Sequence, residues 1–199
     1  MVTRLDVAKI QEAVRLKYAE VARSAEGKFK YATGRAGAAA LGYDLSVAAG
    51  LPQSVLQSFC GVGNPFTLGP IGAGEAVLDL GCGAGFDLIV ASRLVGPGGR
   101  VCGIDLTPEM VDKARQTLER AGVRNAEVRV AGAEAIPYAD AAFDVVLSNG
   151  VLNLSPRKVT LLREIHRVLR PGGRLQFADI VLNEELPAEV AASPQAWSD

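Results

Sequence analysis

Apolar and polar residues follow two different periods along the chain. In the first part, four apolar residues recur at helical spacing with charged residues between them: Ile10, Val14, Tyr18 and Val21. This spacing predicts an amphipathic helix over 4–25, ended by Gly27. The following stretch, 27–75, is rich in glycine and shows only a short helical pattern within 52–59. We expect it to cover the rest of the protein as a lid.

From residue 76 onward, short apolar runs alternate with amphipathic segments. The runs predict strands at 76–80, 100–105, 126–132, 143–149 and 174–181, and the segments between them predict helices at 86–95, 107–122 and 156–170. Thr107 and Pro108 form an N-cap and first-turn pair. In the last helix, Leu162, Ile165 and Leu169 are expected to face the core, and the glycines after Pro171 are expected to end it.

Strands that alternate with helices in this way indicate βαβ units and therefore a parallel sheet. The expected fold is α/β: a Rossmann-like, doubly wound, mainly parallel sheet of about five strands flanked by helices, with an N-terminal helical lid. The expected organisation is an N-terminal helix and lid at 1–74, a ligand-binding core at 75–182 and a tail at 183–199.

Composition narrows the class further. The chain has 199 residues, of which 49% are hydrophobic and 22% charged, so it can build a globular core. Lys and Arg together number 21 against 22 for Asp and Glu, which leaves no strongly basic surface for nucleic acid. Because the sequence has neither a signal-peptide pattern nor an apolar stretch of about 18 residues, we expect no membrane association and a cytoplasmic location. The three cysteines lack CxxC spacing, which argues against a metal site or a disulfide framework.

A glycine-rich loop follows the first predicted strand of the core. The segment from Asp79 to Gly85 reads DLGCGAG and opens the next helix. Glycine lets a backbone turn tightly and approach a ligand closely. Dinucleotide sites use G-x-G-x-x-G, whereas here the third glycine comes one residue earlier and an acid precedes the loop. An acid beside the loop disfavours a phosphate and favours a cation, so S-adenosylmethionine fits better than a dinucleotide.

Two further segments fit an adenosine ligand. Asp105 ends the second core strand, where a carboxylate can accept both ribose hydroxyls; its alternative is an ordinary acid before a helix. Residues 131–136 (AGAEAI) are expected to flank the adenine ring through backbone amides, Ala133 and Ile136. Glu134 fits this site or a surface position equally well.

The runs VLDLGCGAG, GIDLTPEM, FDVVLSNGVLNLSP and VLRPGGRL, in this order, resemble the class I S-adenosylmethionine-dependent methyltransferases over about residues 75–182. TGRAGAAALGYD, GVGNPF and FADIVLNEELP extend a resemblance to the arsenite methyltransferase family over nearly the whole chain. The resemblance implies that Asp79, Gly81, Cys82, Gly83 and Gly85 hold the methionine end of the cofactor. It also implies that Asp105 holds the ribose, Leu106 and Met110 contact the adenine, and Asn149 faces the sulfonium and the substrate. Relatives often carry an acid at the position of Gly132.

The same resemblance implies As(III) as substrate, as a thiol conjugate, with a thiol reductant such as glutathione or thioredoxin. Arsenic(III) prefers thiolates, and its lone pair needs positioning more than a general base. The single histidine, His166, reads as a solvated helix residue. Cys60 lies near the family's first cysteine position and is a candidate catalytic residue or a buried apolar residue; the second position is Gly150. Cys82 and Cys102 read as structural with respect to arsenic.

The third family cysteine would follow Asp199, where the sequence stops, and class I methyltransferases normally add two strands after the fifth. The expectation is therefore a C-terminally truncated product, with a selenocysteine codon read as a stop as one hypothesis and an expression boundary as another. Two other functions stay open: methylation of another small organic molecule, and a truncated, inactive domain that still binds the cofactor.

Overall fold

The computed structural model describes residues 6–184, 190 and 193–197. Its centre is a five-stranded parallel sheet in the order β3-β2-β1-β4-β5. The strands are β1 (Ala76–Leu80), β2 (Arg100–Asp105), β3 (Ala126–Val130), β4 (Phe143–Asn149) and β5 (Leu169–Ala178). The strand order reverses between β1 and β4, so their carboxyl ends open a crevice there. The predicted Rossmann-like sheet of five parallel strands is confirmed.

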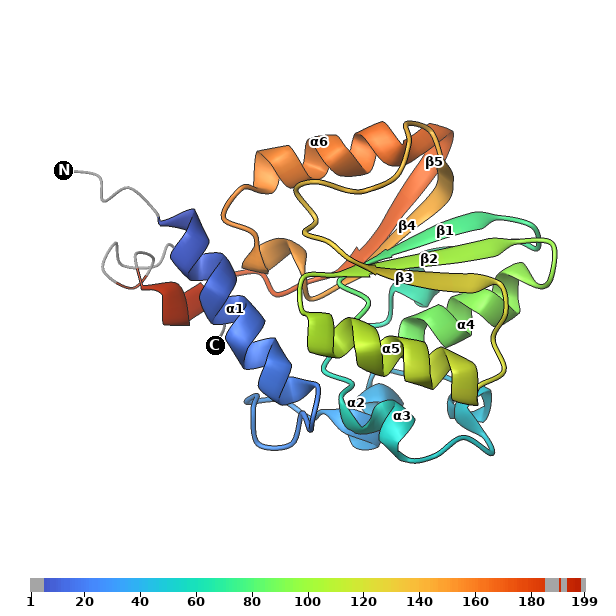
Figure 1. Ribbon diagram of the computed structural model, residues 1–199, viewed down its shortest axis with the longest axis horizontal. Coiled ribbons are helices and arrows are strands. Elements are labelled where there is room, and N and C mark those ends of the chain that lie inside the picture. The colour runs from blue at the N-terminus through green and yellow to red at the C-terminus, as the bar shows by residue number, and fades with distance from the viewer. Residues whose placement is uncertain (1–5, 185–189, 191–192, 198–199) are drawn as a thin grey trace.

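Helices cover both faces of the sheet (Figure 1). On one face lie α4 (Phe86–Val95) and α5 (Pro108–Arg120), and on the other lies α6 (Lys158–Val168). Successive strand residues point to opposite faces, which explains why Val77 packs in the α4–α5 core and Leu78 in the α6 core. Helix α4, β1, β2 and β4 have the predicted bounds.

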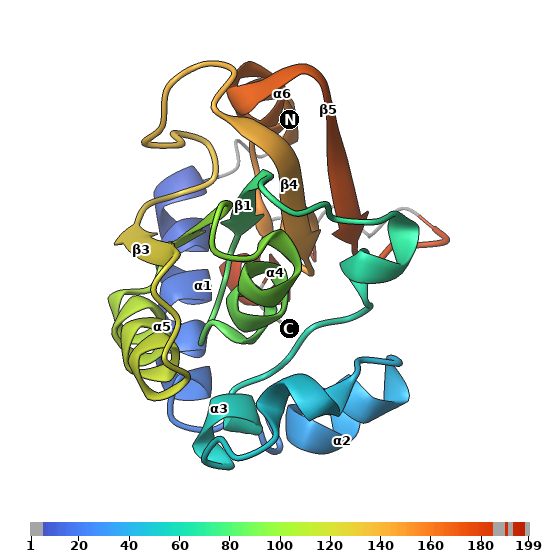
Figure 2. The same cartoon turned by 90° about the vertical axis from the view of Figure 1, so that its right-hand side faces the viewer.

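The N-terminal segment packs onto the same core. It contains α1 (Val7–Val21), α2 (Gly34–Ala40), α3 (Ser54–Gln57) and the 3₁₀ turns η1 (Leu45–Ala48) and η2 (Pro65–Leu68). Ala38, Tyr43 and Phe59 belong to one apolar cluster with Val77 and Phe86. Figure 2 shows α2 and α3 below α4, on the side away from the sheet. The stretch 27–75 is therefore a layer of the core as well as a cover.

The predicted bounds of two helices are wrong. Helix α1 ends at Val21, well before Gly27; positions 4 and 5 of its predicted start lie outside the described residues. Helix α6 spans Lys158–Val168 rather than 156–170. Leu161, Ile165 and Val168 face the sheet, while Leu162, predicted to be in the core, is 48% exposed.

The last predicted strand is shifted. β5 begins at Leu169, which pairs with Phe143, and runs through the predicted Pro171 break because the register shifts before Arg174 pairs with Val145. It ends at Ala178 instead of residue 181, since the Asp179 carboxylate accepts the N–H groups of Asn153 and Ile180 and turns the chain. β3 likewise ends at Val130 instead of residue 132, and the next residue, Ala131, donates its N–H to the carbonyl of Asp105, the last residue of β2.

Part of the predicted tail 183–199 lies outside the described residues. Within the described part, the 3₁₀ turn η4 (Pro194–Trp197) lies beside α1 (Figure 1). The Lys158 ammonium stands 4.9 Å from the centroid of the Trp197 ring. In the part of the chain that the structure describes, no helix has the length and apolar character needed to span a bilayer.

Candidate active site

The loop between β1 and α4 brings backbone to the crevice at the switch in strand order. Gly81 has φ +65°, and a Cβ on it would lie 2.3 Å from Cγ2 of Val151. Gly83 has φ +51° and its missing Cβ points into open space. Both line one cavity, whose empty space is about 850 Å³ when the open solvent at its mouth is included. Gly81 therefore permits a close contact, and Gly83 leaves room for a ligand.

Asp105 stands at the end of β2 beside this loop. Its Oδ2 accepts the Gly83 N–H over 2.9 Å, and its Oδ1 accepts the Thr107 N–H over 2.8 Å. Burial raises the pKa of Asp105, and these two backbone hydrogen bonds oppose the rise. The carboxylate is thus fixed by backbone on both sides and lines the cavity.

A second wall comes from α5 and the loop after β3. Leu106, Met110, Ala133 and Glu134 line the cavity, whereas Ile136, which was also predicted to contact the adenine, is buried outside it. Glu134 Oε1 accepts the Ser155 hydroxyl over 2.6 Å, so this acid belongs to the cavity wall rather than to the open surface.

The loop after β3 is tied to α6 by Arg167. Its guanidinium donates to the carbonyls of Ile136 and Tyr138 and to the carboxylates of Glu164 and Asp140. Because the planar Arg167 guanidinium donates to two carbonyls of the loop at once, it ties the loop to α6. Arg167 therefore fixes the wall formed by Ala133 and Glu134.

Three residues predicted to bind the cofactor lie behind the wall. Asp79 is 2% exposed, and its Oδ2 has no hydrogen-bond partner among the described residues. Burial, and then the nearby Asp87 and Asp105, raise the pKa of Asp79. Cys82 is buried, with its Sγ 2.9 Å from where a Cβ on Gly103 would stand, and Gly85 packs on Ala114. These residues shape the loop from behind and do not line the cavity.

Both predicted catalytic residues line the cavity. Asn149 ends β4, and its side chain bonds to the loop 61–63, with Oδ1 accepting the N–H groups of Val62 and Gly63. Cys60 precedes this loop, and its carbonyl accepts the Tyr31 hydroxyl over 2.9 Å. Burial raises the pKa of the Cys60 thiol to about 12, so the thiol is protonated at neutral pH. The described residues contain no cluster of three metal-ligating side chains.

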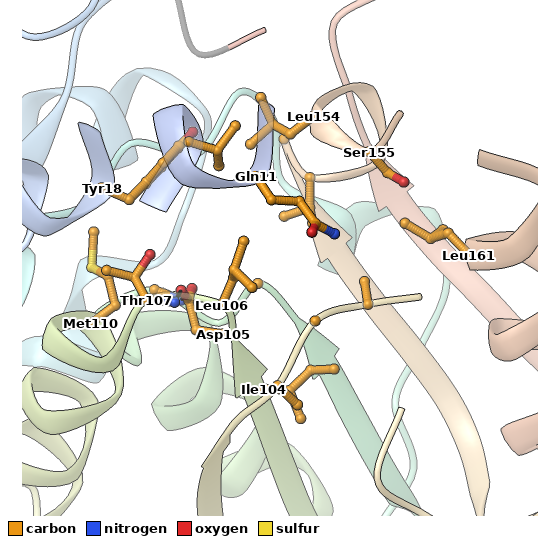
Figure 3. A pocket seen from close by; sticks show the side chains of 18 of the residues that line it. Gln11, Tyr18, Ile104, Asp105, Leu106, Thr107, Met110, Leu154, Ser155 and Leu161 are labelled. Atoms are coloured by element: carbon orange, nitrogen blue, oxygen red, sulfur yellow. Dashed lines mark hydrogen bonds between the residues drawn. The ribbon is translucent and has the colours of Figure 1, made fainter. Parts of the chain in front are cut away.

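Helix α1 forms the roof of the cavity, which the sequence did not indicate. Gln11, Val14 and Tyr18 line it. Figure 3 shows Gln11 reaching down from α1 into the cavity and Tyr18 lying above Thr107 and Met110, with Ser155 and Leu161 on the far side. The helical spacing of Val14 and Tyr18 predicted a buried face, but a sequence pattern cannot tell burial against a core from burial over a ligand site.

Comparisons with known proteins agree with this geometry. A family model described as a methyltransferase domain matches residues 71–198. A solved SAM-dependent methyltransferase from Aquifex aeolicus is 30% identical with a TM-score of 0.55, over 63% of this chain and 70% of that one. The chain therefore belongs to the S-adenosylmethionine-dependent methyltransferases, which confirms the predicted class and cofactor.

Within that family, the similarity points to one branch. An arsenite methyltransferase from Halobacterium salinarum is 37% identical over 98% of this chain and 54% of its own length. The structure of CrArsM, an arsenic(III) S-adenosylmethionine methyltransferase from Chlamydomonas reinhardtii, is 37% identical with a TM-score of 0.65, over 75% of this chain and 52% of that one. The chain thus spans about half the length of these relatives.

The cavity suits S-adenosylmethionine by its own features. The open space at Gly83 accommodates a ligand against backbone, and Asp105 offers a carboxylate beside it. Leu106 and Met110 provide apolar contacts. Asp105 is also an acid on the cavity wall, which suits a ligand that carries positive charge.

Proposed function

We propose that this chain methylates As(III) presented as a conjugate with a small thiol, with S-adenosylmethionine as methyl donor. The observation that carries the proposal is that Cys60 lines the same cavity as Gly83 and Asp105. Thiols are the ligands that a soft centre such as As(III) prefers. The similarity to the arsenite methyltransferase of Halobacterium salinarum also includes the N-terminal segment that carries Cys60, outside the matched methyltransferase domain.

The positions of the cavity residues support a role for each in binding S-adenosylmethionine. Asp105 accepts the ribose hydroxyls, and Leu106, Met110 and Ala133 contact the adenine, with Glu134 fixing that wall. Gly81 and Gly83 bring backbone to the methionine end, while Asp79, Cys82 and Gly85 act from behind the loop. When bound, S-adenosylmethionine supplies an electrophilic methyl group.

The cavity offers positioning rather than base catalysis. No histidine or lysine lines it among the described residues, and His166 is exposed on α6. A lone-pair nucleophile needs no proton removed, so placement at the reacting atom is the main requirement. A hydroxyl or amine substrate usually requires a general base, and the two carboxyls on the described cavity wall, Asp105 and Glu134, are already engaged in hydrogen bonds with the protein.

Loading of Cys60 takes place by thiol exchange. As the Cys60 sulfur bonds to the arsenic of an arsenic–thiol conjugate, its proton passes to the sulfur of the small thiol, whose bond to arsenic breaks, so that the small thiol leaves protonated. Atoms and charge balance without an oxidant. Glutathione is a suitable thiol, and thioredoxin is a protein alternative.

The test is methyl transfer by the purified chain with S-adenosylmethionine, arsenite and glutathione. Methylated arsenic is separated by liquid chromatography and detected by arsenic mass, and S-adenosylhomocysteine is counted in parallel. Cys60→Ser should lower methylarsenic formation at least about tenfold with little change in cofactor affinity. Cys102→Ser, in β2 and away from the cavity wall, is the matched control.

A second function has its own supporting observation. Gly150 lines the cavity without a thiol, and the described residues hold no second cysteine on the wall beside Cys60. This favours another small organic substrate. Release of S-adenosylhomocysteine with such a molecule, and none with arsenite, would establish that reading. Cofactor binding without any transfer would instead indicate a binding domain.

A further inference from the structure

A buried polar network lies next to the cavity and outside the roles proposed above. Its centre is Tyr43, from the N-terminal segment. The Tyr43 ring packs against Phe59, Phe86 and Phe66, with centroid distances of 5.3, 5.5 and 6.1 Å. Because aromatic rings packed on several sides have few alternative rotamers, the hydroxyl is held in one direction.

The Tyr43 hydroxyl joins two elements of the core. It donates to Oδ2 of Asp87 over 3.1 Å and accepts from Nδ2 of Asn149 over 3.0 Å. Asp87 lies in the first turn of α4, directly after the glycine loop, and Asn149 ends β4. Asn149 Nδ2 also lies 3.4 Å from Asp87 Oδ2. The three side chains form a closed triangle.

The side-chain amide of Asn149 also bonds to the loop 61–63. Its Oδ1 accepts the Val62 N–H over 2.8 Å and the Gly63 N–H over 3.2 Å, and its Nδ2 donates to the Gly63 carbonyl over 2.9 Å. A Cβ on Gly61 would lie 2.4 Å from Asn149 Nδ2, and a Cβ on Gly63 would lie 2.4 Å from the Ala178 Cβ. The loop therefore sits closer to β4 and β5 than any side chain would allow.

We propose that Tyr43 and Asp87 are positioning residues that hold Asn149 in the orientation that fastens the loop 61–63 to the substrate side of the cavity. The Asn149 amide makes its hydrogen bonds with the loop 61–63 and with Tyr43. In this arrangement it holds the loop in place and does not point at a ligand. The inference concerns the wall itself and stands whether or not arsenic is the substrate.

The loop matters because of what it places on the cavity wall. Cys60 enters the wall at one end of the loop. Cγ2 of Val62 lies 3.4 Å from where a Cβ on Gly150 would stand, so Val62 closes the wall behind Gly150. Without the clamp, both contacts would loosen together.

This buried network lowers the stability of the folded protein. Asp87 Oδ1 is buried without a hydrogen-bond partner among the described residues, as is Asp79 Oδ2. Burial of a carboxyl with an unmet oxygen costs stability, whereas an apolar core would not. The hydrogen bonds that Tyr43 and Asp87 do make with Asn149 hold its amide in one orientation.

The test compares Tyr43→Phe and Asp87→Asn with the wild type, and uses Tyr138→Phe as a matched loss of one phenol hydroxyl elsewhere. Hydrogen exchange of the Val62 and Gly63 amides reports the clamp directly. We expect protection of these amides to fall by about threefold to tenfold in both variants, with cooperative unfolding retained. Alkylation of Cys60 by iodoacetamide, read by peptide mass mapping, should become several-fold faster. Tyr138→Phe should change neither.

Kinetics separate positioning from simple destabilisation. We expect the variants to raise KM for the methyl acceptor and lower kcat, while S-adenosylmethionine affinity by calorimetry stays within about twofold. Unchanged amide protection and Cys60 reactivity in a folded Tyr43→Phe protein would overturn the proposal. If Tyr43→Phe fails to fold, Asp87→Asn, which keeps the side-chain shape, decides it by the same readouts. A wild type inactive on arsenite contradicts the proposed function alone, because exchange and alkylation need no substrate.

Discussion

The Asp105 carboxylate and the backbone of Gly83 are joined by a hydrogen bond of 2.9 Å, across the gap between β2 and the glycine loop. One side chain thereby sets the distance between two parts of the cavity that are 22 residues apart in the chain. A ligand that bridges them meets a wall already in place, which lowers the ordering cost of binding.

Asp105→Asn should weaken S-adenosylmethionine binding by roughly 10- to 100-fold, since an amide has one acceptor oxygen where the carboxylate has two and hydrogen bonds to charged groups contribute about 1.5–3 kcal/mol. Isothermal titration calorimetry measures the change. Asp112→Asn, an exposed acid on α5 paired with Arg115, is the control and should bind normally. An affinity for Asp105→Asn within twofold of the wild type would remove Asp105 from the site.

Gly81→Ala should destabilise the protein more than Gly122→Ala. Both glycines have φ +65°, so both variants meet the same backbone penalty of about 1–2 kcal/mol. At Gly122 the new Cβ meets nothing within 4 Å, whereas at Gly81 it would lie 2.3 Å from Val151. The difference in unfolding free energy, from urea titrations, isolates the cost of the close contact. Equal losses would mean that the loop relaxes around Val151 without cost.

Asp87→Asn should change how stability depends on pH. Burial raises the pKa of Asp87 from 3.8 to about 6, against the lowering effect of its bonds from Tyr43 and Asn149. The folded protein then holds a proton between about pH 4 and 6 that the unfolded chain has lost. Asp87 therefore costs no stability at the acid end of that window, and stability falls as pH rises through the folded pKa.

The stability that Asp87 costs above its folded pKa is about 3 kcal/mol at most, because its pKa is shifted by about two units and each unit corresponds to 1.36 kcal/mol. Relative to the wild type, Asp87→Asn should gain unfolding free energy between pH 4.5 and pH 7.5. Denaturant titrations of both proteins at the two pH values measure this gain. A difference between them that is the same at both pH values would contradict a titrating Asp87.

Lys113→Met should loosen the N-terminal segment. The Lys113 ammonium donates to the Ala22 carbonyl over 2.7 Å and to Ser58 Oγ over 2.6 Å, and so ties α5 to the C-terminal end of α1 and to the residue after α3. A cation at a helix C-terminus is also favourable. The expected loss is about 1–3 kcal/mol, with faster proteolysis around residues 22–30. Lys9→Met, exposed on α1, should change unfolding free energy by less than about 0.5 kcal/mol; if Lys113→Met does no more than this, the tie contributes little.

Local pattern was enough to predict most of the core. The runs at 76–80, 100–105 and 143–149 became strands with those bounds because each is apolar on both faces and bounded by turn residues. The glycine loop and Asp105 were identifiable for the same reason: both follow strands, and the ends of parallel strands meet at one edge. The errors fell where a tertiary bond competes with local propensity, as at Asp179, whose carboxylate ends β5.

Some residues of the candidate site could likewise be identified from the sequence, and others only from the tertiary structure. The sequence by itself placed Asp105 at the end of a strand beside the glycine loop, and its resemblance to the methyltransferases added Leu106 and Met110 as adenine contacts. Only the tertiary structure decided that Asn149 clamps the loop 61–63, that Tyr43 and Asp87 orient it, and that α1 roofs the cavity. These contacts join residues 62 to 106 positions apart, and their geometry depends on how whole layers pack, which no local spacing encodes.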